Sequence, residues 1–282
     1  MIQAINYFIT GIFDILLYPF GFLGDFWELL FLSIVVSLIV LLIFKWVSSP
    51  KKIKDTKNKI KSNILAIRLY KDFWKVITAS FFKSLFYTFK YFLLNFGPVL
   101  ILLPFLLPFF VQMDIRYGMR AYENDEVFVV KAKFNSNVYD LDIKMLDNDN
   151  FKPVLNPVFI NAYEDEEHTR LIQEVNWKLK TIKNGITDIQ LKVNDRILSK
   201  NLVIGKYHGA LSNKKLRKSS IGHFIYPVEN LLAESDQVEA VMIQYPAKSI
   251  SFLGIRTHWL VYHLILVVII VLALRKRFGV EF

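Results

Sequence analysis

Few residues in this chain are of a type that could bind a metal ion or transfer a proton. The five histidines lie at positions 168, 208, 223, 258 and 263, and they include no HExxH motif and no i, i+4 pair. His258 and His263 are five residues apart, which places them on different helix faces and disfavours a shared metal ion. His263 stays a candidate functional residue, because an ionisable side chain within a membrane helix often serves a function.

Other residue patterns that support catalysis are missing from the sequence. The chain has no Cys, which excludes disulfides, a thiolate nucleophile and Cys-ligated metal centres. The acidic run at residues 164–167 lacks the spaced ligands and the glycine of a calcium loop, so we expect a solvated loop there. Neither a phosphate-binding glycine loop nor a GxSxG elbow occurs. We therefore expect no catalytic residue, metal or cofactor, and no enzymatic activity.

A polar stripe marks the approach to one of the apolar segments. Ser84, Thr88, Tyr91 and Asn95 recur at spacings of four, three and four residues, so they share one helix face. Two interpretations stay open, because polar faces at membrane depth turn toward other helices or toward water. The stripe either packs against a helix or lines a hydrophilic groove open to the cytoplasm. Prolines at positions 98, 104 and 108 are expected to kink or unwind the helix farther along.

The elements that must position these residues are membrane helices. Hydrophobic residues make up 54% of the 282-residue chain, which exceeds the usual content of a soluble domain. Three stretches carry no charge over enough residues to enter a bilayer: 29–44, 91–113 and 259–274. Trp27, Trp46 and Trp259 flank the two shorter stretches and extend them to the membrane interfaces.

The distribution of charge predicts the orientation of the spans. Residues 45–90 contain twelve Lys or Arg against two Asp, which equals the net charge of +10 of the whole chain. Basic loops stay in the cytoplasm, so we expect an exoplasmic N-terminus and a cytoplasmic C-terminus, where Arg275, Lys276 and Arg277 lie. The basic excess is therefore explained by membrane topology and does not indicate nucleic-acid binding.

The basic loop itself has the pattern of a helical hairpin. Ile60, Ile64, Ile67 and Trp74 keep three- and four-residue spacing on a Lys-rich background, as in an amphipathic or coiled-coil helix. The chain must turn near residues 68–73, because the second span has to enter the bilayer again. The lysines set topology and contact anionic headgroups, whereas the apolar stripe requires a partner helix, the membrane surface or a client protein.

The exoplasmic segment changes to a two-residue period. Residues 127–134, 138–145, 170–179, 186–193 and 238–245 are β-rich, and Asn184-Gly185 is a hairpin-type turn between two of these runs. Short strands at this spacing predict an antiparallel, loosely immunoglobulin-like sandwich with Trp177 in its core.

The predicted fold is therefore an α-helical membrane protein with three transmembrane helices and an exoplasmic all-β, sandwich-like domain. Its segments are an exoplasmic amphipathic helix (1–26), transmembrane helix 1 (27–46), a basic cytoplasmic hairpin (47–90), transmembrane helix 2 (91–113), the exoplasmic β-sandwich domain (114–257), transmembrane helix 3 (258–275) and a cytoplasmic tail (276–282).

This layout resembles the YidC/Oxa superfamily of membrane-protein insertases. The resemblance rests on the first span ending in FKWVSSPKKIK, on the hairpin containing LYKDF and on the Pro-rich second span GPVLILLPFLLPFF. It implies a water-filled cytoplasmic groove that lets a client's short polar segment cross without ATP, with the hairpin receiving clients and the stripe from Ser84 to Asn95 lining part of the groove. The family's groove arginine has no counterpart inside the spans, where Lys45 is the nearest cation. The β domain also lies between spans two and three, and two further spans of the bacterial proteins are absent.

Two functions follow as expectations. The first is an insertase or membrane chaperone of the bacterial inner membrane, with membrane lipids and membrane-protein clients as partners. The second is a non-catalytic structural or adaptor subunit of a larger inner-membrane envelope or transport complex, with the β domain docking an exoplasmic protein. A β domain without a catalytic constellation fits a binding module, although fold alone does not decide function.

Overall fold

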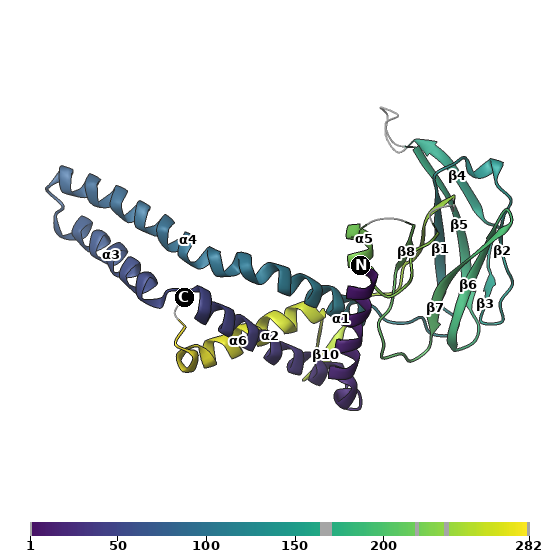
Figure 1. Cartoon of the computed structure of the whole chain (residues 1–282), viewed down its shortest axis with the longest axis horizontal. Helices are drawn as coiled ribbons and strands as arrows, with labels where there is room; N and C mark the ends of the chain where they lie inside the picture. Colours follow the sequence, from purple (N-terminus) through teal and green to yellow (C-terminus); the bar gives the residue numbers. More distant parts are fainter. Residues whose placement is uncertain (1, 164–170, 218–219, 234–236, 281–282) are drawn as a thin grey trace. The chain divides into compact units, whose positions relative to one another are not determined.

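The computed structural model describes residues 2–163, 171–217, 220–233 and 237–280, which form helices and antiparallel strands (Figure 1). The chain divides into two compact units. One unit comprises Met1–Asp25 with Pro108–His258, and the other comprises Phe26–Leu107 with Trp259–Phe282. Helices with an antiparallel β region are the fold class that the sequence predicts.

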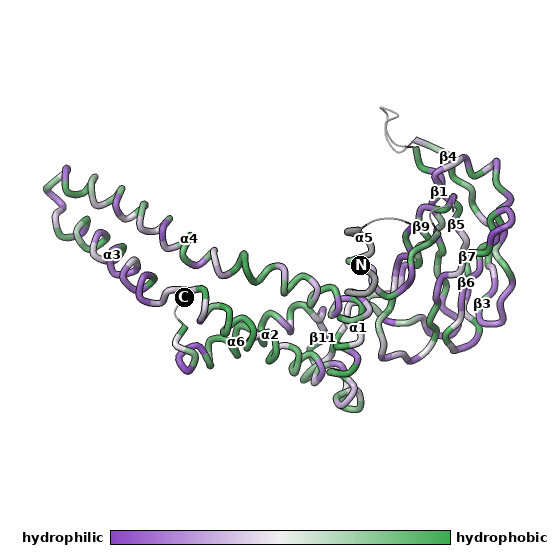
Figure 2. Tube along the Cα trace, viewed as in Figure 1, coloured by the Kyte–Doolittle hydropathy of each residue, from purple (hydrophilic) through white to green (hydrophobic). Residues whose placement is uncertain are grey.

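The second unit is built from long helices. These are α2 (Asp25–Val47), α3 (Pro50–Leu69), α4 (Trp74–Met113) and α6 (Trp259–Phe278), of which α2 and α4 begin or end in the other unit. By length and composition, α2, α4 and α6 are apolar enough to span a membrane. Figure 2 shows these helices as largely hydrophobic and α3 as largely hydrophilic.

The chain turns between α3 and α4 at the expected place. Helix α3 ends at Leu69, and α4 begins at Trp74 after main-chain hydrogen bonds from Tyr70 to Ala66 and from Phe73 to Tyr70. The two helices form a hairpin in Figure 1.

Of the two effects expected from the prolines, a kink or unwinding, the structure contradicts unwinding. Helix α4 continues through Pro98, Pro104 and Pro108 as one α-helix of 40 residues. A proline removes only one main-chain hydrogen bond from a helix, and membrane helices tolerate that loss. The backbone departs from α-helical geometry only after Met113, where Asp114–Gly118 (η2) forms one π-helical turn.

The first unit begins with the expected amphipathic helix. Helix α1 (Ile2–Leu17) is followed by the 3-10 turn η1 (Tyr18–Phe20). Gly24 then adopts a φ of 91°, a left-handed conformation that favours glycine, and the chain turns into α2.

The rest of this unit is the β domain, whose described residues form eleven strands and the short helix α5 (Ser220–Ile225). The strands are β1 (Val127–Phe134), β2 (Ile143–Met145), β3 (Phe151–Pro153), β4 (Val158–Tyr163), β5 (Leu171–Thr181), β6 (Gly185–Val193), β7 (Arg196–Ile204), β8 (Lys214–Leu216), β9 (Val238–Ile243), β10 (Ile250–Phe252) and β11 (Ile255–Thr257).

Two antiparallel sheets enclose one hydrophobic core. The larger sheet has the order β3-β5-β1-β9-β8, with β4 also paired to β5, and the smaller sheet has the order β2-β6-β7. Phe128, Val130 and Trp177 of the larger sheet share a core cluster with Ile189 and Leu202 of the smaller one. Trp177 is 4% exposed, which confirms its predicted place in the core.

The expected hairpin at Asn184-Gly185 is wrong. These residues join β5 to β6, which belong to different sheets and do not pair. The observed hairpin is β6–β7, with Asn194 at a φ of 54° in its turn. The run at 138–145 is also not one strand, because Val138–Asp140 (η3) forms a 3-10 turn before β2.

Candidate functional site

The α3–α4 hairpin divides the predicted apolar stripe into buried and exposed residues. Ile60 and Ile67 are half-buried and continue the helical spacing of the buried Ile53. Ile64 is 45% exposed and Trp74 is 76% exposed. The hairpin therefore keeps one apolar row for its own packing and leaves Ile64 and Trp74 at the surface of the described structure.

The predicted polar stripe on α4 is placed unevenly. Ser84, Tyr91 and Asn95 are half-buried, in line with the buried Ser80, whereas Thr88 is exposed. The Asn95 side-chain amide donates to the carbonyl oxygen of Tyr91 at 2.8 Å. Ser84, Tyr91 and Asn95 thus lie on the side of α4 that is partly covered within the unit, whereas Thr88 lies on its exposed side.

Lysines of α3 lie above tyrosine rings of α4. The distance from Nζ to the ring centroid is 5.6 Å for Lys57 over Tyr91 and 5.2 Å for Lys59 over Tyr87. Cation–π contacts at such distances contribute about 0.5–1 kcal/mol each at exposed sites. Tyr91, a stripe residue, is therefore also a contact that holds the two helices of the hairpin together.

His263 belongs to the packing of α2 against α6. Its Nδ1 lies 2.8 Å from Ser33 Oγ, and both residues are buried. The Ser33 hydroxyl donates its proton to the Leu29 carbonyl oxygen at 2.7 Å. Since a hydroxyl has only one proton, this pattern leaves His263 Nδ1–H as the donor to Ser33. The histidine pairs with α2 and is not part of the α4 stripe.

Lys45 lies in the last turn of α2 and is exposed. A cation there interacts favourably with the partial negative charge at the helix C-terminus. Within the described residues, Lys45 makes no hydrogen bond or ion pair with the stripe on α4, and His263 pairs with Ser33 of α2. The candidate residues therefore do not form one cluster.

A buried arginine ties α1 to the end of α4. Arg116 in the π-helical turn donates to Asp14 Oδ1 at 2.5 Å and to the Thr10 carbonyl oxygen at 3.3 Å. It also donates to the Gln112 side chain at 2.5 Å, and its guanidinium lies 5.5 Å from the ring centroid of Phe13. Helix α1 is thus anchored by charge as well as by apolar packing.

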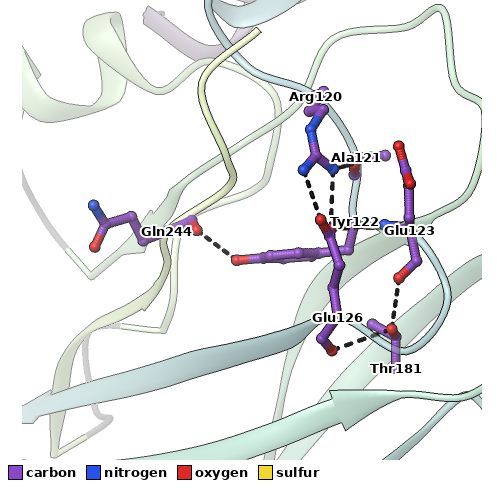
Figure 3. Close-up of polar contacts among 7 residues, drawn as sticks. All are labelled: Arg120, Ala121, Tyr122, Glu123, Glu126, Thr181 and Gln244. Carbon is purple, nitrogen blue, oxygen red and sulfur yellow. Dashed lines mark hydrogen bonds and ion pairs between the residues drawn. The ribbon is translucent and has the colours of Figure 1, made fainter.

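The segment that leads from the π-helical turn into β1 is held by a second arginine (Figure 3). Arg120 donates to both carboxylate oxygens of Glu126, at 3.0 and 2.6 Å. Hydrogen bonding from Arg120 lowers the pKa of Glu126 below its ordinary value. The Tyr122 hydroxyl donates to the Gln244 carbonyl oxygen at 2.5 Å, which links this segment to the end of β9.

An ion pair lies inside the β domain. Lys200 on β7 contacts Glu229, and their side chains are 1% and 3% exposed. The Lys200 ammonium also donates to the Ser212 carbonyl oxygen at 2.7 Å, and Glu229 accepts from the Asn201 backbone N–H at 3.1 Å. Burial lowers the pKa of Lys200, and Glu229 acts in the opposite direction. The pair closes the outer edge of β7 with side-chain hydrogen bonds.

Sequence reasoning missed the residues Arg116, Lys200 and Glu229. The signal available for Arg116 was its position next to the apolar second span, together with Asp14 on the amphipathic helix. For the Lys200–Glu229 pair no local signal existed, because its members are 29 residues apart.

Within the part of the chain that the structure describes, no three His, Cys, Asp or Glu side chains converge as a metal site. The acidic run at 164–167 and His168 lie outside the described residues.

No protein-family model, curated protein or solved structure matches this chain. Its class is therefore defined by the structure alone: helices apolar enough to span a membrane, joined to an antiparallel β domain. The described surfaces include the polar and aromatic α4, the basic α3 and the faces of the two sheets.

Proposed function

We propose that the chain is a membrane-protein insertase or membrane chaperone of the YidC/Oxa type, which presents a polar, cytoplasm-facing surface to client segments without nucleotide hydrolysis. The observation that carries the proposal is the two-sided character of α4. Its polar row from Ser80 to Asn95 runs along one side, while large aromatic side chains are exposed along the rest. Those that are at least half exposed are Trp74, Phe81, Phe82, Phe86, Phe89, Phe92 and Phe105.

This combination suits the transfer of a short polar segment. An unpaired polar group costs several kcal/mol in a hydrocarbon environment, and hydroxyl and amide side chains at membrane depth reduce that cost. The aromatic side faces lipid. The basic α3 adds attraction to an anionic membrane surface, worth about 1 kcal/mol per Lys or Arg close to it.

The proposal includes an orientation. With the Lys-rich hairpin in the cytoplasm, the N-terminus and the β domain lie in the periplasm of a bacterial inner membrane, and the C-terminus lies in the cytoplasm. The partners are then membrane lipids and newly made membrane proteins, with no role for nucleic acid.

A second candidate is a non-catalytic adaptor subunit of an inner-membrane envelope or transport complex. It is favoured by the β domain, whose larger sheet leaves apolar side chains such as Val127, Val129 and Val158 about half exposed. In this case the spans pack against other subunits and the β domain docks a periplasmic protein.

Site-specific photo-cross-linking in native membranes tests the first candidate. A photoreactive residue is placed at Ser84, Thr88 or Asn95, and the matched controls are Leu85 and Phe92, which lie on the same helix and are 59% and 56% exposed. The adducts are identified by mass spectrometry.

An insertase or chaperone yields a heterogeneous set of newly made membrane proteins from the polar stripe and lipid or background from the controls. One or two stoichiometric partners from all positions would overturn this proposal in favour of the adaptor. Equal yields of the same clients from stripe and controls would refute the role of the stripe.

A further inference from the structure

The outer face of the larger sheet is strongly basic. The burial of β1 alternates, with Phe128, Val130, Ala132 and Phe134 in the core, so the other residues of the strand point outward. The ladders then bring six lysines to this face: Lys131 and Lys133 on β1, Lys178 and Lys180 on β5, Lys152 on β3 and Lys214 on β8. These four strands belong to the larger sheet.

Few acidic groups balance these lysines. Lys131 pairs with Glu174 at 3.0 Å and Lys180 pairs with Asp125 at 2.9 Å. The structure gives no acidic partner for Lys133, Lys152, Lys178 or Lys214 among the residues that it describes. Glu239, which is exposed on β9 near the bulge opposite Lys133, is a further carboxylate at this edge.

Among the residues that the structure describes, basic side chains therefore outnumber acidic ones on this face. Residues 113–257 carry twenty Lys or Arg and nineteen Asp or Glu, and six of these acidic residues lie outside the described part of the chain. Like charges that face each other on neighbouring strands are unfavourable. Lys152 and Lys180 are nevertheless direct cross-strand partners, and Lys178 lies two residues from Lys180.

Three of the lysines surround a pocket of about 310 Å³ on this face. Lys131, Lys133 and Lys214 supply its charge, and Val129 and Met242 are among its apolar residues. Asn213 also lines the pocket, and its carboxamide oxygen is buried without a hydrogen-bond partner among the described residues. The pocket thus combines cations with an apolar floor.

We propose that this face binds an acidic, partly apolar polypeptide segment of another protein. The lysines attract carboxylates, and the half-exposed valines between them, Val127 and Val129, offer area to apolar side chains. A polypeptide offers apolar side chains as well as carboxylates, whereas a phosphate or sulfate polymer offers charge alone. This inference does not rest on the insertase proposal, because the face is a property of the β domain alone.

Peptide binding to the purified full-length protein in neutral detergent micelles tests the proposal. The probe is a fluorescent peptide of alternating Glu and Val, and fluorescence anisotropy measures its Kd. The variant K131Q/K133Q/K214Q removes three charges at the pocket. The matched variant K144Q/K183Q/K192Q removes three charges from lysines on and beside the smaller sheet. Circular dichroism verifies that both variants fold.

We expect the Kd of the pocket variant for the peptide to be at least about tenfold higher than that of the wild type. Three exposed charge pairs of about 0.5 kcal/mol each together correspond to a tenfold change in Kd. The matched variant should stay within about twofold of the wild type, and polyphosphate or dextran sulfate should compete only weakly. The proposal is overturned if the peptide does not bind, if both variants lose affinity equally or if the polyanions bind more tightly than the peptide. The peptide-binding experiment does not measure client cross-linking from α4. A failure to bind the peptide would therefore not count against the insertase proposal.

Discussion

At the residue scale, the most demanding contact is the buried pair of Lys200 and Glu229. Removing one member of a buried ion pair leaves the other charge without compensation, which costs about 3–5 kcal/mol. We expect Lys200→Met to destabilise the β domain by this amount, because the Glu229 side chain is only 3% exposed. Urea unfolding of the purified protein measures the change through tryptophan fluorescence, to which the core residue Trp177 contributes.

The double variant K200M/E229Q is the control for this interpretation. It leaves no buried charge, and the glutamine oxygen can still accept from the Asn201 backbone N–H, as Glu229 does at 3.1 Å. It should therefore be more stable than K200M. If the two variants were equally unstable, the loss would come from packing and not from an uncompensated charge.

The ion pair of Glu126 with Arg120 should make the stability of the β domain depend on pH. Its pKa is lowered from an ordinary value of 4.5, mainly by the hydrogen bond from Arg120. A carboxyl group with a lowered folded-state pKa contributes stability above its ordinary pKa and loses it as the pH falls through the lowered value. Both side chains are about one-third exposed, so the contribution is at most about 1 kcal/mol.

We therefore expect the midpoint of thermal unfolding to fall less steeply below about pH 4.5 in E126Q than in the wild type. The matched variant is E123Q, in the same segment, and it should behave as the wild type. Parallel curves for E126Q and the wild type would contradict a stabilising pair.

At the element scale, the amphipathic helix α1 is fixed by Arg116 and not by apolar packing alone. Gln112 donates to the Thr10 hydroxyl at 3.1 Å, so cysteines at these two positions should react with a short bismaleimide. The chain has no native Cys, which makes the background clean. We expect R116Q to reduce the cross-linking yield severalfold, since it removes the pairing with Asp14. A pair of T10C with N156C, on the loop between β3 and β4, is the negative control, and an undiminished yield in R116Q would contradict the anchoring role.

The elements differ in how well the sequence predicts them. The helices α2, α4 and α6 follow from uninterrupted apolar composition, and β1 follows from strict alternation. Strand β7 was missed because Lys200 occupies one of its inward positions, where the pattern requires an apolar residue. Glu229 and the Ser212 carbonyl oxygen, both from other segments, make that lysine compatible with the core. Long-range pairing of this kind leaves no trace in a local pattern.

The predictions of a hairpin at Asn184-Gly185 and of an unwound second span failed for a related reason. Asn184-Gly185 encodes a sharp turn, but a turn does not determine whether its flanking strands pair or enter different sheets. Pro104 lies inside an intact α4, because the surrounding helix outweighs the loss of one hydrogen bond. The stripe residues Ser84, Thr88, Tyr91 and Asn95 lie on one α-helix, but Thr88 is exposed whereas the other three are half-buried. Their function stays a prediction.

At the scale of the whole molecule, the orientation of the spans can be measured directly. Single cysteines at Ser62 on α3 and at Asn156 in the β domain are both exposed and lie in different units. With the basic hairpin in the cytoplasm, an impermeant maleimide should label N156C in intact spheroplasts and S62C only after permeabilisation. The reverse pattern would place the hairpin outside and would contradict the proposed topology.

The central claim is that this chain helps polar segments to cross a membrane without nucleotide. The most direct test is insertion into liposomes that contain the purified protein. The client is a single-span membrane protein with a short acidic tail, supplied without ATP or GTP, and the measurement is the fraction of tails protected from protease.

An insertase should raise the protected fraction severalfold over empty liposomes. The variant S84L/N95L, which removes polar groups from the stripe but keeps the helix, should lower that fraction toward the empty-liposome level. Protection equal to that of empty liposomes with folded wild-type protein present would contradict an insertase function.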